Sequence, residues 1–137
     1  MAIIKWRESY NTGIPQIDKE HEKIIELVNS MFIVIRDKAG KEMVLNTLEQ
    51  TLSYTEYHFE NEEKMMQDAG YPDFEEHMKE HHKLKTDAEQ FKLRLEENFA
   101  DGSKEFYRFL REWVMDHILE CDMKYAKTLK QNIGTTE

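Results

Sequence analysis

The stretch "IDKEHEKIIELVNSMFIVI", residues 17–35, decides the fold class of this chain. Its apolar positions recur at alternating intervals of four and three residues, which places them on one face of an α-helix. This stripe consists of Ile17, His21, Ile24, Val28, Met31 and Ile35. A helix with one apolar face is stable when it packs against other elements, and here a histidine lies within the packing face.

Three further segments repeat this helical spacing. The second segment carries Val44, Leu48, Leu52, Thr55, Phe59, Glu62 and Met66. The third carries Phe74, His77, His81, Leu84, Ala88, Phe91 and Leu95, and the fourth carries Phe106, Leu110, Trp113, His117, Tyr125 and Leu129. No segment alternates with period two for long enough to form a sheet, and the turn signals between segments are short. The sequence therefore predicts an all-α protein, an up-down-up-down antiparallel four-helix bundle with an N-terminal arm.

We expect residues 1–137 to form a single domain, with an arm over residues 1–16. The helices are expected over about 17–38, 41–68, 73–98 and 103–131, because turn residues separate these ranges. Asp73 with Glu76 resembles an N-cap and its reciprocal carboxylate, and Ser103 is the expected cap of the last helix. The arm is expected to pack across the bundle, although Trp6 and Tyr10 offer a docking surface as an alternative.

Composition excludes several classes of protein. Apolar residues make up 39% and charged residues 34% of the chain, which indicates a soluble globular protein. A net charge of −9 disfavours nucleic acid and anionic membranes as partners. We expect no integral membrane segment, since no apolar run approaches the ~20 residues of a bilayer span. The start of the chain lacks a signal peptide's apolar region and Cys121 is the lone cysteine, so we expect a cytoplasmic location.

Five histidines lie on the predicted buried faces: His21, His58, His77, His81 and His117. A single histidine on an apolar face is more often a core residue than a ligand. Five buried imidazoles without partners would be costly, whereas a metal ion would satisfy their nitrogens. With ~1.5 Å of rise per residue, all four antiparallel helices can bring histidines to one layer. His82 points about 100° away from His81 and is expected at the surface.

Two pairs of residues have the spacing of chelating groups. His58 with Glu62, and His77 with His81, lie four residues apart and therefore share a helix face. The chain contains neither HExxH nor Glu-x-x-His, which argues against a zinc protease and against the ferritin-like di-iron carboxylate proteins. A histidine-rich pair of metals has fewer anionic ligands, which favours holding dioxygen reversibly over cleaving it.

Several motifs resemble those of the hemerythrin family, specifically a single-domain bacteriohemerythrin. They are Trp6, Tyr10, "GIPQID" at 13–18, "HFENEE" at 58–63, "YP" at 71–72 before His77 and His81, Trp113, and "HILECDMKY" at 117–125. The resemblance spans the chain from Trp6 to Tyr125. It implies a non-haem di-iron centre with two Fe ions per chain and an oxo or hydroxo bridge.

By this resemblance, one iron is held by His77, His81 and His117, and the other by His21 and His58, with Glu62 and Asp122 bridging. Asp122 is the one assignment that helical spacing opposes. The five-residue step from His117 rotates a regular helix by roughly 140°, whereas Glu120 and Cys121 would share the face of the histidine. We follow the family and predict that the helix is locally unwound, or contains a π-bulge, between His117 and Asp122.

The resemblance further implies reversible binding of dioxygen, end-on to the five-coordinate iron held by His21 and His58, as a hydroperoxide. The expected role is oxygen transport, storage or delivery rather than enzymatic turnover. The expected wall of the oxygen pocket comprises Ile24, Ile25, Phe59, Trp113, Val114 and Ile118.

Two other classes of function use the same kind of centre. One is an enzyme that scavenges peroxide or nitric oxide, and the other is a module that senses oxygen or iron. The sequence shows no appended signalling domain, which weakens the sensor interpretation. Dioxygen is the expected ligand, an oxygen-consuming recipient protein is a candidate partner, and the sequence does not identify that recipient.

Overall fold

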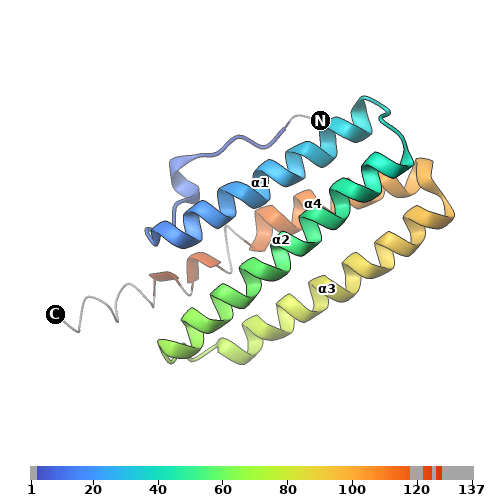
Figure 1. The fold of residues 1–137 in the computed structure, drawn as a ribbon. Coiled ribbons are helices and arrows are strands. Elements are labelled where there is room, and N and C mark those ends of the chain that lie inside the picture. The colour runs from blue at the N-terminus through green and yellow to red at the C-terminus, as the bar shows by residue number, and fades with distance from the viewer. Residues whose placement is uncertain (1–2, 118–121, 125, 128–137) are drawn as a thin grey trace.

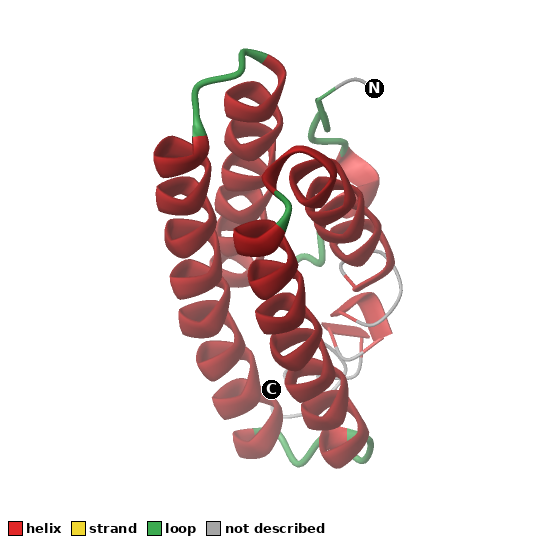
Figure 2. Cartoon of the chain, turned by 90° about the vertical axis from the view of Figure 1, so that its right-hand side faces the viewer, coloured by secondary structure: helices red, strands yellow, loops and turns green. Residues whose placement is uncertain are grey.

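The computed structural model describes residues 3–117, 122–124 and 126–127. A short 3-10 turn, η1 (Glu8–Tyr10), precedes four α-helices: α1 (Pro15–Arg36), α2 (Lys41–Asp68), α3 (Phe74–Glu97) and α4 (Phe99–Asp116). Within these ranges every regular element is helical (Figure 2). Helix α1 packs on α2 and α4, and α3 packs on the same two helices, which closes the bundle (Figure 1). The predicted four-helix bundle is confirmed.

The first helix begins at Pro15, two residues earlier than predicted. Proline at the first helical position has its backbone angle already set for the helix and lacks an N–H group that would have no partner there. The preceding turn is held by the Asp18 carboxylate, which accepts hydrogen bonds from the Thr12 backbone (2.6 Å), the Thr12 hydroxyl (2.7 Å) and the Gly13 backbone (3.2 Å). Gly13 has φ of 86°, a left-handed conformation that favours glycine.

The starts of the last two helices differ from the prediction. Helix α4 begins at Phe99 rather than near Ser103, and Ser103 lies inside the helix, where its hydroxyl donates to the Ala100 carbonyl. Gly102 also lies inside α4, at a point of close contact with α3 and not in a turn. A Cβ atom added there would lie 2.9 Å from the Leu95 Cα. Asp73 occupies the N-cap position of α3, but its side chain makes no capping hydrogen bond, so the predicted reciprocal cap is not formed.

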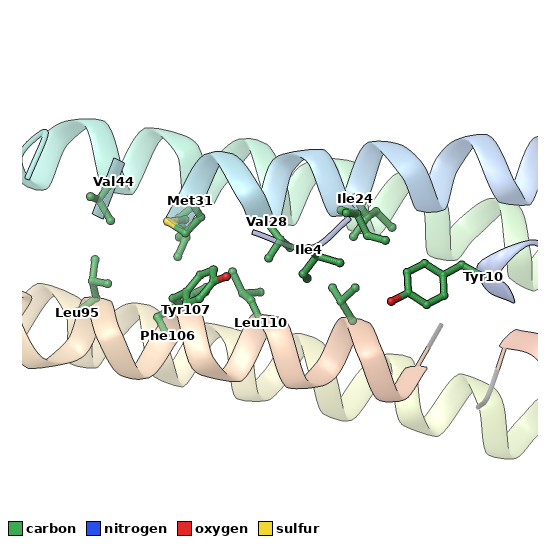
Figure 3. Packing of buried hydrophobic residues seen from close by; sticks show 13 residues of the cluster. Ile4, Tyr10, Ile24, Val28, Met31, Val44, Leu95, Phe106, Tyr107 and Leu110 are labelled. Atoms are coloured by element: carbon green, nitrogen blue, oxygen red, sulfur yellow. The ribbon is translucent and has the colours of Figure 1, made fainter. Parts of the chain in front are cut away.

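Two apolar clusters fill the bundle, one much larger than the other. The larger includes Ile24, Val28, Leu48 and Leu110 and runs along most of the helices (Figure 3). The smaller consists of Ile17, Met66 and Tyr71 near one end. His21 lies one turn after Ile17 and one turn before Ile24 on α1. A layer of polar side chains therefore separates the two clusters.

The N-terminal arm packs along α1 (Figure 1). Asn29 exchanges two hydrogen bonds of 2.8 Å with the backbone N–H and carbonyl of Ile4. Ile4 and Tyr10 are buried in the larger cluster, and Trp6 meets the Tyr10 ring edge-on at 5.5 Å. The expectation that the arm packs on the bundle is confirmed, and burial removes Tyr10 from any docking surface.

Candidate metal centre

The polar layer between the two apolar clusters is built by all four helices. Helix α1 supplies His21, α2 supplies His58 and Glu62, α3 supplies His77 and His81, and His117 follows the last residue of α4. Asp122 completes the layer. None of these seven side chains is more than 5% exposed. The spacing of each helix stripe directs these groups inward together with the flanking apolar residues.

The seven side chains form two groups that share two members. In the first group, ligand atoms of His21, His58, Glu62 and Asp122 all lie within 4.8 Å of one another. In the second, the same limit holds for Glu62, His77, His81, His117 and Asp122. The structure thus brings together every residue that the sequence predicted as a metal ligand, and both carboxylates belong to both groups.

Each carboxylate directs one oxygen at each group. Glu62 Oε1 contacts His58 Nε2 and lies 3.4 Å from His21 Nε2, whereas Oε2 lies 3.4 Å from His77 Nε2 and 3.6 Å from His81 Nε2.

Asp122 repeats this division. Its Oδ2 is 2.7 Å from His21 Nε2, and its Oδ1 is 2.9 Å from His117 Nε2 and 3.2 Å from His77 Nε2. A carboxylate that splits its oxygens in this way has the geometry of a bridge between two metal ions.

Asp122 and His117 differ in helix geometry from the residues of α4. His117 and Asp122 both have π-helical conformation, whereas the residues up to Asp116 are α-helical. A π turn closes its hydrogen bond over five residues instead of four, so residues five apart share a face. This agrees with the predicted π-bulge. Ile118, Glu120 and Cys121 lie outside the described residues.

The two buried carboxylates give the layer negative charge, which suits the binding of positive ions. Both oxygens of Asp122, and Glu62 Oε2, are buried and make no hydrogen bond of good geometry within the described part of the chain. Burial alone would raise the pKa of both carboxyl groups, but the surrounding imidazoles hold the pKa of Glu62 and of Asp122 well below the usual range. Three buried carboxylate oxygens that lack a well-formed hydrogen bond, on groups that stay ionised, need positive charge beside them, and metal ions bound by the five imidazoles would supply it.

The pKa values of His21, His58 and His77 shift in the opposite direction, upward. Burial lowers the pKa of His77, but the neighbouring carboxylates of Asp122 and Glu62 outweigh burial and raise this pKa to about 9. The pKa values of His21 and His58 are also raised, against the effect of burial, by Asp122 and Glu62. Without metal, protons on the imidazoles therefore neutralise the carboxylates, and a metal ion has to displace these protons.

Two carboxylates outside the predicted set contact the Nδ1 atoms of candidate ligand histidines. Glu20 Oε1 lies 2.7 Å from His58 Nδ1, and Glu63 Oε1 lies 3.1 Å from His81 Nδ1. Burial raises the pKa of Glu20, but its contacts with His58 and with two amides outweigh burial and lower it. Helical spacing did not predict either residue, because each contacts a histidine on another helix. The sequence offered one indication: Glu20 is adjacent to the candidate ligand His21, and Glu63 is adjacent to the candidate ligand Glu62.

Aromatic rings cover the group of three histidines. Phe59 stacks on His81 with centroids 3.7 Å apart and meets Trp113 edge-on at 5.5 Å. Trp113 in turn stacks on His117 at 5.2 Å. The other described members of the predicted oxygen pocket, Ile24, Ile25 and Val114, are buried in the larger apolar cluster. His82 is exposed, as predicted.

This fold and this layer define a class of protein: a helical bundle that gathers five histidines and two shared carboxylates as candidate ligands for a pair of metal ions. Residues 12–129 match the hemerythrin HHE cation binding domain. The chain belongs to the hemerythrin family.

Individual relatives cover nearly the whole chain. Bacteriohemerythrin of Stenotrophomonas maltophilia is 30% identical over 98% of this chain and 86% of that protein. Bacteriohemerythrin of Methylococcus capsulatus is 29% identical over 94% of this chain and 98% of that protein, and myohemerythrin of Theromyzon tessulatum is 29% identical over 91% and 92%.

A crystal structure of wild-type hemerythrin superposes with a TM-score of 0.79 at 28% identity, covering 93% of this chain and 98% of the other. None of the helices described here is both long and apolar enough to cross a membrane.

Proposed function

We propose that this chain binds dioxygen reversibly at a pair of non-haem iron ions and so carries, stores or delivers it. The observation that carries the proposal is the orientation of the two carboxylates. Glu62 and Asp122 each direct one oxygen toward each histidine group. Membership of the hemerythrin family supports the same function. When bound, two ferrous ions supply the two electrons that reversible dioxygen binding requires.

His77, His81 and His117 would hold one iron, and His21 and His58 the other. Glu62 and Asp122 would bridge the two ions, together with an oxo or hydroxo group. Imidazole suits iron, and carboxylates suit a bridge between two ions, so the donor set fits this metal. The side of His21 and His58 has one imidazole fewer, so an iron held there would have a coordination position available for dioxygen.

The chain's own residues would keep that position dry. Ile24 lies one turn after His21 on α1, and it is only 1% exposed. Val114 is equally buried on α4. An apolar wall limits the entry of water and protons, which would otherwise displace the ligand and leave the irons oxidised. We assign this role to Ile24, Ile25 and Val114, whereas Phe59 and Trp113 cover the group of three histidines.

Iron analysis combined with visible absorption tests the proposal. Protein reduced without oxygen, exposed to air and returned to low oxygen should contain about two irons per chain and show a charge-transfer band that appears and disappears reversibly. Two irons with irreversible oxidation would instead point to an enzyme that scavenges peroxide or nitric oxide. Protein without iron would contradict the proposal.

We place the carrier in the cytoplasm, with an oxygen-consuming protein as the recipient. The lone Cys121 cannot form a disulfide within the chain, as is usual for a protein of a reducing compartment, and this supports the proposed location. Purified carrier loaded with dioxygen should lose it faster when an oxygen-consuming recipient is present.

A further inference from the structure

Glu20 is a charged side chain that is only 5% exposed, and it does not face the metal layer. It lies on α1 next to His21, but it points toward α2. Its Oε1 is 2.7 Å from His58 Nδ1. Its Oε2 accepts hydrogen bonds from the Asn61 amide at 2.9 Å and from the Gln16 amide at 3.2 Å. Three donors on two helices therefore fix the carboxylate in one orientation.

This contact determines where His58 carries its hydrogen. An ionised carboxylate only accepts hydrogen bonds, so the Nδ1 facing Glu20 must be the protonated nitrogen. In a neutral imidazole, protonation of Nδ1 leaves the lone pair on Nε2. His58 Nε2 is the atom that contacts Glu62 within the metal layer. The lone pair thus points to the place where a metal ion would bind.

We propose that Glu20 is a positioning residue that selects the metal-binding tautomer of His58 and thereby determines whether the two-histidine side of the centre is loaded. This inference rests on the proposed function, since it concerns the iron that would take dioxygen. That side has only His21 and His58 as imidazole donors, so the wrong tautomer of His58 removes half of them.

The three-histidine side depends less on such a contact. Glu63 faces His81 Nδ1 at a longer distance, 3.1 Å, and its side chain is 26% exposed, so water can take its place. His77 and His117 also remain as donors when His81 is poorly oriented. The two sides of the centre are therefore expected to differ in their dependence on a supporting carboxylate.

Replacing Glu20 by glutamine keeps the size of the side chain and reverses its hydrogen bonding. Asn61 and Gln16 both donate to the position of Oε2, which holds the new amide oxygen there. The amide nitrogen then faces His58 Nδ1 and donates to it, and this moves the histidine hydrogen to Nε2. A hydrogen on Nε2 blocks metal binding at that atom.

The test is an anaerobic titration of metal-free protein with ferrous iron, with the wild type, Glu20→Gln and Glu22→Gln compared. Glu22 is exposed on the same helix, so its substitution removes the same charge without touching His58. The wild type and Glu22→Gln should bind two equivalents. Glu20→Gln should bind the second equivalent at least roughly tenfold more weakly, as expected for a residue that orients a ligand. Equal binding by Glu20→Gln and Glu22→Gln would overturn the inference.

A second measurement does not depend on any variant. Nitrogen NMR of the zinc-loaded wild type should show His58 with a hydrogen on Nδ1 and metal on Nε2, and the opposite assignment would overturn the inference. Wild-type protein that binds two irons but shows no reversible oxygen band would contradict the proposed function, while the comparison of the variants still decides the role of Glu20.

Discussion

At the scale of single residues, Trp113 offers the clearest test of the apolar cover. Its ring stacks on His117 and meets Phe59 edge-on, so it shields the histidine layer from solvent. Trp113→Ala should admit water and accelerate autoxidation by roughly tenfold, because the apolar shell controls solvent access to a metal site. The measurement is the decay of the oxygenated absorption band in air.

Phe109→Ala, which removes a ring packed on Phe91 and Phe106, is the control. Equal rates in Trp113→Ala and the wild type would remove Trp113 from the functional residues.

The residues found from sequence and those missed differ in one physical respect. Helical spacing placed five histidines in one layer because each belongs to the buried stripe of its own helix. The same rule opposed Asp122, which lies in the layer and, like His117, has π-helical conformation. Glu20 and Glu63 were missed because their partners lie on other helices, and spacing within one helix carries no information on contacts between helices.

At the scale of helices, Gly102 sets how closely α3 and α4 approach. A Cβ at this position would lie 2.9 Å from Leu95 Cα and 3.2 Å from the Arg94 carbonyl oxygen, and neither backbone atom can move away on its own. Gly102→Ala should therefore destabilise the protein by about 2 kcal/mol, even though alanine is the better helix former. Urea unfolding measures this change. Lys104→Ala, at an exposed position of the same helix, should leave stability within about 0.5 kcal/mol. A Gly102→Ala protein as stable as the wild type would show that the helices separate without cost.

Gly102 also explains where the predicted helix limits were wrong. Glycine next to Asp101 and Ser103 has the composition of a turn, and sequence analysis therefore started the last helix near residue 103. The structure instead starts α4 at Phe99 and uses the missing side chain of Gly102 for packing. A glycine needed for a close approach and one needed for a turn look the same in a single sequence.

At the scale of the whole molecule, the metal layer connects folding with metal binding. Bound metal stabilises the folded state because the unfolded chain lacks the assembled site, and at a free concentration of 100 times Kd this amounts to ~2.7 kcal/mol. Removing the metal with a chelator should therefore lower the midpoint of urea unfolding. A midpoint that does not change on metal removal would contradict a metal site in this layer.

The stability of the metal-free protein should also depend on pH, in a direction that the pKa values determine. His77 has a pKa of about 9 in the folded state, above its usual 6.5, because Asp122 and Glu62 outweigh the effect of burial. Its contribution is complete below pH 6.5 and disappears as the pH rises through 9. We expect a loss of about 3 kcal/mol between these limits.

The carboxyl groups determine where the stability of the metal-free protein falls at acidic pH. The pKa values of Glu62 and Asp122 are lowered by the imidazoles despite burial, so their contribution is present above the usual values of 4.5 and 3.8 and is lost as the pH falls through the lowered values. Metal-free protein should therefore be most stable between about pH 4.5 and 6.5. Metal binding releases protons and strengthens as the pH rises, so the metal-loaded protein should keep its stability toward pH 9. Urea unfolding at pH 6 and pH 9, with and without metal, separates the two cases. Parallel pH profiles for the loaded and metal-free forms would show that the imidazole protons and the metal do not compete for the same atoms.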